Sequence, residues 1–376
     1  MASAPSGTSV GKYEASSMPR KTDALIKNAK KILLPKIIGM TTSGQENFDY
    51  IIKEIDGTEN YSNIGGSVSI ALSMAFAHAC AKARGLPLHQ GMKKSKRYLL
   101  PYPMGKCIGG GAHAKNSTAI QEFLSIPVGA KNMAEAIRAN RRMHAIVYNA
   151  LKENFPMFKR QLDYEGGWIA RIGDEDALGI MTGAAVHVAA ETGISMRIGI
   201  DIAASNLYWN EKYHYGGETK KTGEQLEYVL DLIDEYNLYY VEDAFQEDDF
   251  GSFAELTKRA KGCLICGDDL FATNATRLER GIKMSACNAI IIKPNQAGTL
   301  SQTYDAIKMA RKKEYTPIVS HRSGETMDTT IASLAVARSC PIIKIGIVGK
   351  EREAKLKELL KIERSEKLKM NGEING

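Results

Sequence analysis

Short apolar runs alternate with longer segments of helical spacing over most of the chain beyond residue 103. Eight of these runs have the length and the β-branched content of buried strands. Such alternation favours a parallel sheet joined by crossover helices, and eight strands predict a closed (β/α)₈ barrel of the α/β class. The predicted strands are residues 104–108, 122–128, 197–202, 238–242, 264–268, 289–293, 317–321 and 342–346, and the predicted helices include 223–236, 275–284, 300–312 and 329–337.

An open, doubly wound sheet is the alternative arrangement of the same elements. The nucleotide-binding version of that fold carries a Gly-x-Gly-x-x-Gly turn directly after a strand. None of the eight predicted strands is followed by such a turn, so the barrel is favoured.

The first 98 residues have a different pattern, which predicts a small α-rich domain. Residues 67–84 have the apolar content of a long helix, and Gly85 and Pro87 end it. Residues 93–103 are basic, contain proline and have the composition of a linker. We therefore expect an amino-terminal domain over residues 1–98 and the barrel over residues 99–376.

Composition excludes several classes of protein. The 376 residues are 44% hydrophobic, which is too apolar for a disordered chain, and six cysteines in apolar surroundings do not form a disulfide framework. No run approaches the ~20 apolar residues of a membrane span, and the opening residues lack a signal-peptide pattern, so we expect a cytoplasmic protein. The 50 basic and 43 acidic residues give a net charge of +7. An anionic small substrate accounts for it, and no nucleic-acid motif accompanies it.

Ionisable residues end one predicted strand after another. In a barrel the carboxyl ends of the strands open onto one face, so these side chains should converge there. Carboxylates are hard oxygen ligands that suit Mg²⁺, and of two neighbouring lysines one can serve as a neutral base. A base that faces a metal site can remove a weakly acidic proton beside a carboxylate, because the metal neutralises the developing enediolate. The residues are Asp201, Glu242, Asp268, Lys293, His321 and Lys344.

Along almost its whole length the chain resembles the enolase family. The most specific of the matching segments is SHRSGET at residues 320–326, followed by the strand end IIIKPNQAGTL at 290–300. The others are SGTSVGKYEA (6–15), GGGAHA (109–114), QEFLSIPVGA (121–130), IDIAAS (200–205), VEDAFQEDD (241–249) and GDDLFATN (267–274). The resemblance implies a (β/α)₈ barrel with a smaller α+β amino-terminal capping domain, here without its first strands, and a homo-oligomer.

The same resemblance implies a lyase of glycolysis and gluconeogenesis that reversibly dehydrates 2-phospho-D-glycerate to phosphoenolpyruvate through an enediolate. It implies two Mg²⁺ ions per site. Asp201, Glu242 and Asp268 would hold the first, and Ser9 in the opening loop would join the substrate phosphate around the second.

Roles for the remaining residues also follow from the resemblance. Lys293 would remove the C2 proton, and Lys344 would pair with the substrate carboxylate. Four residues would bind or enclose the substrate: Arg322 and Ser323 at its phosphate, His113 on a closing loop, and His321 along the pocket.

A carboxyl pair on the other side must protonate the departing hydroxide. Glu122 is one member. For the second, we choose Glu165 over Glu175, because Tyr164–Trp168 keeps the family's Glu-Gly-Gly-aromatic pattern and Glu175 suits the start of a helix.

Two alternatives stay open at this point. The chain could be an enolase-like paralogue that acts on another 2-phospho or 2-hydroxy carboxylate. It could also be a catalytically impaired or surface-binding form, for which the charged segment 349–369 is the only hint. Mixed charges at helical spacing are more typical of a solvated helix. Smaller departures from the family pattern include Gly109 and Tyr164.

Overall fold

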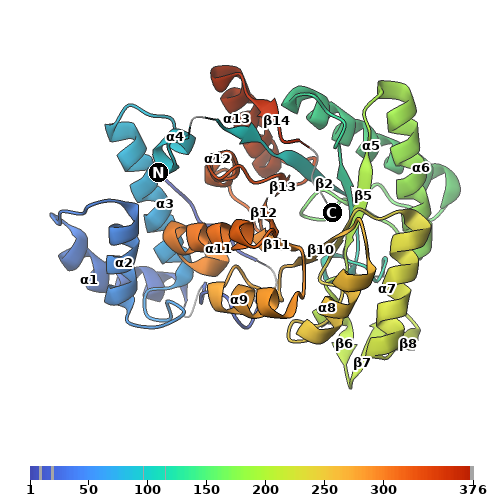
Figure 1. The fold of residues 1–376 in the computed structure, drawn as a ribbon, viewed down its shortest axis with the longest axis horizontal. Helices are drawn as coiled ribbons and strands as arrows, with labels where there is room; N and C mark the ends of the chain where they lie inside the picture. The colour runs from blue at the N-terminus through green and yellow to red at the C-terminus, as the bar shows by residue number, and fades with distance from the viewer. Residues whose placement is uncertain (8–10, 18–20, 96, 115, 373–376) are drawn as a thin grey trace.

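A computed structural model describes residues 1–7, 11–17, 21–95, 97–114 and 116–372. Its amino-terminal part is helical and lies against one side of a barrel (Figure 1). In the described part of residues 1–98 the regular elements are four helices, and Ser6 forms an isolated bridge with Gly324 of the barrel. These helices are α1 (Thr22–Ile37), α2 (Gln45–Asp56), α3 (Gly66–Ala83) and α4 (Leu88–Met92).

Eight strands of the described chain close into the predicted barrel. They pair in the order β13-β12-β11-β10-β9-β5-β3-β2, and β2 pairs again with β13. All eight predicted strands are present, with ends that differ by a few residues. Their bounds are β2 (Tyr102–Gly109), β3 (Glu122–Ile126), β5 (Arg197–Asp201), β9 (Tyr240–Glu242), β10 (Leu264–Gly267), β11 (Ala289–Ile292), β12 (Thr316–Ser320) and β13 (Ile342–Lys344).

The expectation that all strands run parallel is wrong for one strand. β3 is antiparallel to both of its neighbours, β2 and β5. Among the described residues of the β2–β3 connection the one regular element is the short 3₁₀ helix Gly111–His113, which is too short to return along the outside of the barrel. Two long helices, α5 (Met133–Asn154) and α6 (Asp174–Thr192), then lie between β3 and β5, and this even number of crossings restores the direction.

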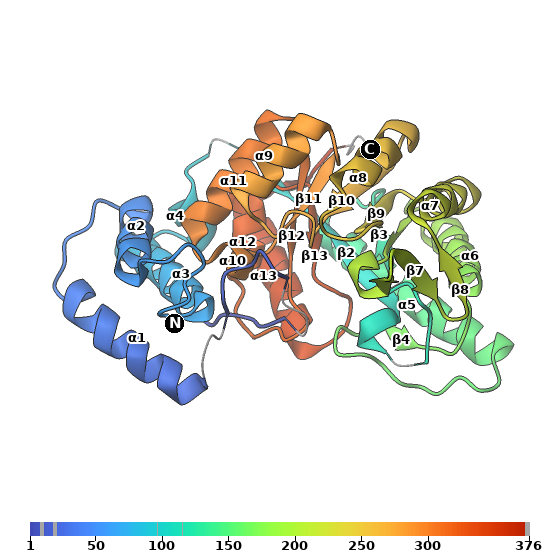
Figure 2. The ribbon, with the colours of Figure 1, turned by 90° about the horizontal axis from the view of Figure 1, so that it is seen from below.

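Helices cover the outside of the barrel (Figures 1 and 2). The four helices predicted beyond residue 200 are all present, within one residue at either end. Several begin where a side chain caps the first turn: Asn132 accepts from an N–H of α5, Asn274 from two of α9, and Thr299 from one of α11. Besides α5 and α6, the outer helices are α7 (Thr222–Tyr236), α8 (Phe250–Arg259), α9 (Ala275–Met284), α11 (Leu300–Lys312), α12 (Thr330–Ala337) and α13 (Lys350–Glu366).

The predicted linker is only partly a linker. Its second half forms β1 (Leu99–Leu100), which pairs with β14 (Lys369–Met370), and then enters β2. The apolar character of residues 98–104 therefore reflects strands rather than a connection. The remaining short elements are β4 (Trp168–Ile169), η2 (Ala204–Leu207), β6 (Tyr208–Trp209), β7 (Lys212–Tyr215), β8 (Glu218–Lys220) and α10 (Pro294–Ala297).

The six cysteines are free thiols, as expected, and Cys263 and Cys266 are both buried around β10. None of the helices in the described chain is long and apolar enough to cross a membrane.

Gly105 of β2 is expected to tolerate no side chain. A Cβ atom there would lie 2.2 Å from Ile347 Cγ1. Because the neighbouring backbone belongs to a closed barrel, Gly105→Ala should lower the free energy of unfolding by about 1–3 kcal/mol, measured by urea denaturation. The matched control is Gly183→Ala on the exposed face of α6, where a Cβ meets nothing within 4 Å. It should be stabilising, since alanine is the better helix former.

Candidate active site

The strand ends bring the predicted ionisable residues together at one mouth of the barrel. Five of them line a single small cavity there: Asp201, Asp268, Lys293, His321 and Lys344. Glu242 lies just beneath and is fully buried. The Lys344 ammonium joins two of the carboxylates, with Nζ 3.1 Å from Asp201 Oδ2 and 2.6 Å from Glu242 Oε2. The Lys293 ammonium pairs with the Asp268 carboxylate.

Buried negative charge is concentrated at the three carboxylates. Burial raises the pKa of Glu242 well above its usual range, and the charge of Asp201 adds to the effect. Burial also raises the pKa of Asp201, although Lys344 opposes it. For Asp268, burial alone would raise the pKa, but the ion pair with Lys293 lowers it. Glu242 Oε1 is buried and has no hydrogen-bond partner among the described residues. An orphaned oxygen within a set of carboxylates is a donor arrangement that fits a divalent cation.

Two further aspartates extend this acidic mouth, and sequence reasoning assigned them no role. Asp243 accepts the N–H of Asp268 (2.9 Å) and of Asp269 (2.8 Å), so its carboxylate is held by backbone. Oxygens of Asp243, Asp268 and Asp269 lie close enough together to share a metal ion. The consecutive acids of the GDDL segment were the signal available in the sequence.

The SHRSGET segment follows β12 and carries the predicted phosphate-binding residues. Arg322 and Ser323 both line the mouth cavity. The Arg322 guanidinium is buried and bound on both sides by Glu14, with Nη1 2.7 Å from Oε2 and Nη2 3.2 Å from Oε1. Burial lowers the pKa of His321 well below its usual value, and nearby Arg352 adds to this, so the ring is neutral at pH 7.

The opening segment lies against this loop. Ser6 and Gly324 exchange two backbone hydrogen bonds of 3.0 and 2.9 Å, and Gly7 lines the mouth cavity. Ser9, the predicted residue at the second metal, lies outside the described residues. Glu14 belongs to the SGTSVGKYEA segment, the sequence predicts no role for it, and it bridges the opening segment to Arg322.

The expectation of a solvated helix at residues 349–369 is wrong for one of its faces. Arg352 and Lys355 of α13 are buried and point at the SHRSGET segment. Arg352 Nη2 donates to the carbonyls of Arg322 (3.3 Å) and Ser323 (3.0 Å). Lys355 donates to the Thr326 carbonyl and pairs with Glu325 at 3.3 Å. Two buried cations therefore hold the backbone of the segment, and charge at helical spacing alone could not distinguish this face from a solvated one.

The two predicted acids line the same cavity, and Glu122 Oε2 lies 2.8 Å from Lys344 Nζ. Glu122 begins β3, and because β3 is antiparallel its first residue lies at the mouth, paired in register with Asp201. Glu165 lies in the connection between α5 and α6, is buried, and lines the same cavity. Glu175 is in the first turn of α6 and exposed, as expected of a helix-start residue. The geometry therefore brings Glu165, and not Glu175, to the mouth.

Lys106 of β2 lies at the centre of the acid pair, and sequence reasoning missed it. Its Nζ atom is 2.7 Å from Asp163 Oδ2, 3.0 Å from Glu165 Oε2, 3.5 Å from Glu122 Oε1 and 2.8 Å from His113 Nδ1. His113, Glu122 and Glu165 have the spacing of a metal site. The ammonium already fills the space between them, so we do not regard this trio as one. A lysine inside the apolar strand 104–108 was the available signal.

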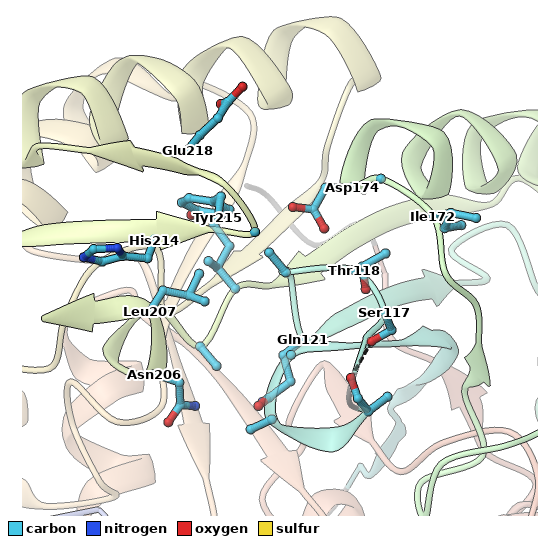
Figure 3. Close-up of a pocket in the computed structure, with 18 of the residues that line it drawn as sticks. Ser117, Thr118, Gln121, Ile172, Asp174, Asn206, Leu207, His214, Tyr215 and Glu218 are labelled. Atoms are coloured by element: carbon cyan, nitrogen blue, oxygen red, sulfur yellow. Dashed lines mark hydrogen bonds between the residues drawn. The ribbon is translucent and has the colours of Figure 1, made fainter.

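A larger cavity of about 970 Å³ lies beside the mouth. It shares Gln121, Ala203 and Asn206 with the mouth cavity. Its walls come from the β2–β3 connection, the start of α6 and the β6–β8 hairpins, and Asp174 and Tyr215 face it from opposite sides (Figure 3). The β2–β3 connection, which carries His113, therefore borders this larger cavity as well as the mouth cavity.

Comparison with known proteins gives consistent matches along the chain. A family model described as the enolase N-terminal domain matches residues 1–92, and one described as the enolase C-terminal TIM barrel domain matches residues 97–376. A curated relative named Enolase from Natronomonas pharaonis is 49% identical over 364 residues, which covers 96% of this chain and 90% of the relative. Enolases from Methanosphaera stadtmanae and Methanothermobacter thermautotrophicus are 47% and 46% identical over 370 residues, covering 96% of this chain and 89% of each relative.

Proposed function

The chain belongs to the enolase family, and we propose that it catalyses the reversible Mg²⁺-dependent dehydration of 2-phospho-D-glycerate to phosphoenolpyruvate. The observation that carries the proposal is that Lys293, which is paired with Asp268, lines the same small cavity as Glu165 and Glu122. An elimination across two adjacent carbons requires a base and an acid that both reach one bound substrate.

Asp201, Glu242 and Asp268 are the residues that would hold the first Mg²⁺, and Ser9 would act with the substrate phosphate at the second. The orphaned oxygen of Glu242 supports the first assignment. When bound, the metal supplies positive charge that stabilises the enediolate form of the substrate carboxylate.

In the proposed reaction, Lys293 first loses the proton of its ammonium group, its Nζ atom then accepts the C2 proton, and Lys344 pairs with the substrate carboxylate. The C3–O bond then breaks and its electron pair leaves with the hydroxide. The hydroxide takes a proton from the Glu165–Glu122 carboxyl pair and departs as water. Arg322 would bind the phosphate, and to do so its guanidinium would exchange hydrogen bonds with Glu14 for hydrogen bonds with phosphate oxygens. Ser323, His113 and His321 would enclose the same ligand.

The direct test is phosphoenolpyruvate formation from 2-phospho-D-glycerate with Mg²⁺, followed by ultraviolet absorbance. We expect turnover that stops when the metal is chelated. Turnover of another 2-phospho carboxylate in preference would favour the paralogue, and none with either substrate would indicate an impaired form. A homo-oligomeric state and a cytoplasmic location stay predictions.

Arg352→Met is expected to weaken substrate binding without removing a group that touches substrate. Two backbone carbonyls of the SHRSGET segment lose their buried donor. The loss should destabilise the ordered conformation of this segment by about 1–3 kcal/mol. We expect KM to rise about tenfold or more, with a smaller change in kcat. The matched control is Arg364→Met on the exposed face of the same helix, which should leave KM unchanged. Equal KM values in the two variants would contradict the assignment.

A further inference from the structure

Lys106 is a buried cation that does not line the mouth cavity. Its side chain is 2% exposed, and it stands directly behind Glu165 and His113, which do line the cavity. An ammonium group loses several kcal/mol of hydration on burial, so it persists only where acceptors surround it. Here the surrounding acceptors include Asp163, Glu165 and His113 at 2.7 to 3.0 Å.

Asp163 links the lysine to the backbone that carries Glu165. Its Oδ2 atom pairs with Lys106, while its Oδ1 atom accepts the N–H groups of Glu165 (2.8 Å) and Gly167 (2.9 Å). Lys106 therefore contacts Glu165 in two ways. It pairs directly with the Glu165 carboxylate, and it pairs with Asp163, which holds the backbone of the loop that carries Glu165.

Glycines make room for this arrangement. A Cβ atom on Gly109 would lie 1.9 Å from Asp163 Oδ2 and 3.1 Å from Lys106 Cε. A Cβ atom on Gly167 would also lie 3.1 Å from Lys106 Cε. Lys106 therefore lies close to both glycine positions, and a side chain at Gly109 would displace Asp163.

Burial and the neighbouring groups act on the pKa of Glu165 in opposite directions. Burial alone would raise the pKa of Glu165, but Lys106, a hydrogen bond with Glu122 and the nearby His113 lower it to about 2. A depressed pKa means that this carboxylate stabilises the fold above pH ~4.5 and that the contribution is lost as the pH falls toward 2. The ionisable groups that face this cluster are Glu122 from β3, His113 from the β2–β3 connection, Asp163 from the same loop, Lys344 beyond Glu122, and His144 from α5 against the Gly166 carbonyl.

We propose that Lys106 is a positioning residue that orients the Glu165 carboxylate toward the mouth and fixes its charge. The inference rests on the proposed function, in which Glu165 exchanges a proton with the C3 oxygen. In phosphoenolpyruvate hydration the ionised carboxylate is ready to take a proton from water, whereas dehydration needs it protonated. Lys106 thereby sets the pH range in which the two directions run.

Lys106→Gln tests the proposal, because the amide keeps a donor for Asp163 and removes the charge. Without Lys106 the burial of Glu165 should dominate and its pKa should rise. We expect the break in the pH profile of dehydration kcat to move upward by at least one pH unit, while exchange of the C2 proton with D₂O stays within about threefold of wild type. Lys106→Arg, which keeps the charge, should retain the wild-type break.

A direct titration keeps the test independent of turnover. In protein labelled with ¹³C at glutamate carboxyls, Glu165 should not titrate above pH 4 in the wild type and should do so in Lys106→Gln. If both proteins show the same Glu165 titration, or if C2 exchange and dehydration fall in parallel in the variant, the proposal is wrong. Absence of any turnover in the wild type would count against the proposed function alone, since the carboxyl titration still reports the effect of Lys106.

Discussion

Replacing Lys293 with alanine is expected to abolish exchange of the substrate C2 proton with solvent deuterium. The reason is that Lys293 is the proposed base, paired with Asp268 and positioned directly after β11. Loss of a positioned base typically costs 10²–10⁴ in rate, and turnover should fall by at least that amount. The measurements are C2 exchange by proton NMR and phosphoenolpyruvate formation by absorbance.

The counterpart is Glu165→Gln, which should keep C2 exchange and lose dehydration. Hydroxide departure needs the acid, whereas removal of the C2 proton does not. Glu175→Gln is the matched control, since this second glutamate is exposed at the start of α6. If Glu175→Gln shows the split between exchange and dehydration instead, the assignment of the acid is wrong. If Lys293→Ala keeps exchange, the base lies elsewhere.

Glu242→Gln should have the second large effect, on metal binding. Glu242 is fully buried and supplies the orphaned oxygen among the three carboxylates. Replacing it would remove one of the three carboxylates that are proposed to hold the cation, and neutral amide oxygens are weaker ligands for Mg²⁺. We expect affinity for Mg²⁺ to fall at least 100-fold in calorimetric titrations, with loss of Mg²⁺-dependent turnover.

The fold should survive this substitution, because Lys344 keeps its pairs with Asp201 and Glu122. Circular dichroism and the thermal midpoint test this directly. Glu279→Gln on the exposed surface of α9 is the control for a change of net charge, and it should bind Mg²⁺ as the wild type does. Wild-type turnover in Glu242→Gln would contradict the metal assignment.

Much of the barrel could be predicted because each strand has a recognisable local sequence pattern. Runs such as 289–293 are short, β-branched and followed by a helical segment, and these features need no knowledge of distant residues. The reversed direction of β3 could not be read in the same way. It depends on the length of helix on either side of the strand, which is a property of the connections rather than of residues 122–126.

Three of the missed residues of the site share one cause. Lys106, Glu14 and Arg352 are buried charges whose partners lie far away in the sequence: Glu165, Arg322 and the carbonyl of Ser323. A buried charged contact of this kind produces no periodic signal in the sequence. The helix or strand that carries it has the same pattern of hydrophobic and polar residues as one without it. The strand-end residues were found since the barrel itself places them on one face.

Closure of the barrel has a consequence for how the chain reaches this structure. The last pairing joins Ile342 of β13 to Tyr102 of β2, the final and the first strand of the barrel. During synthesis β2 is made long before β13 and cannot form this pairing until β13 is complete. Every partial barrel therefore presents two unpaired sheet edges. Contacts between distant residues are reached slowly, since the loop entropy must be lost before they form. The antiparallel β2–β3 pair is local and can form early, so we expect folding to start at this hairpin and to finish only when the carboxyl-terminal strand arrives.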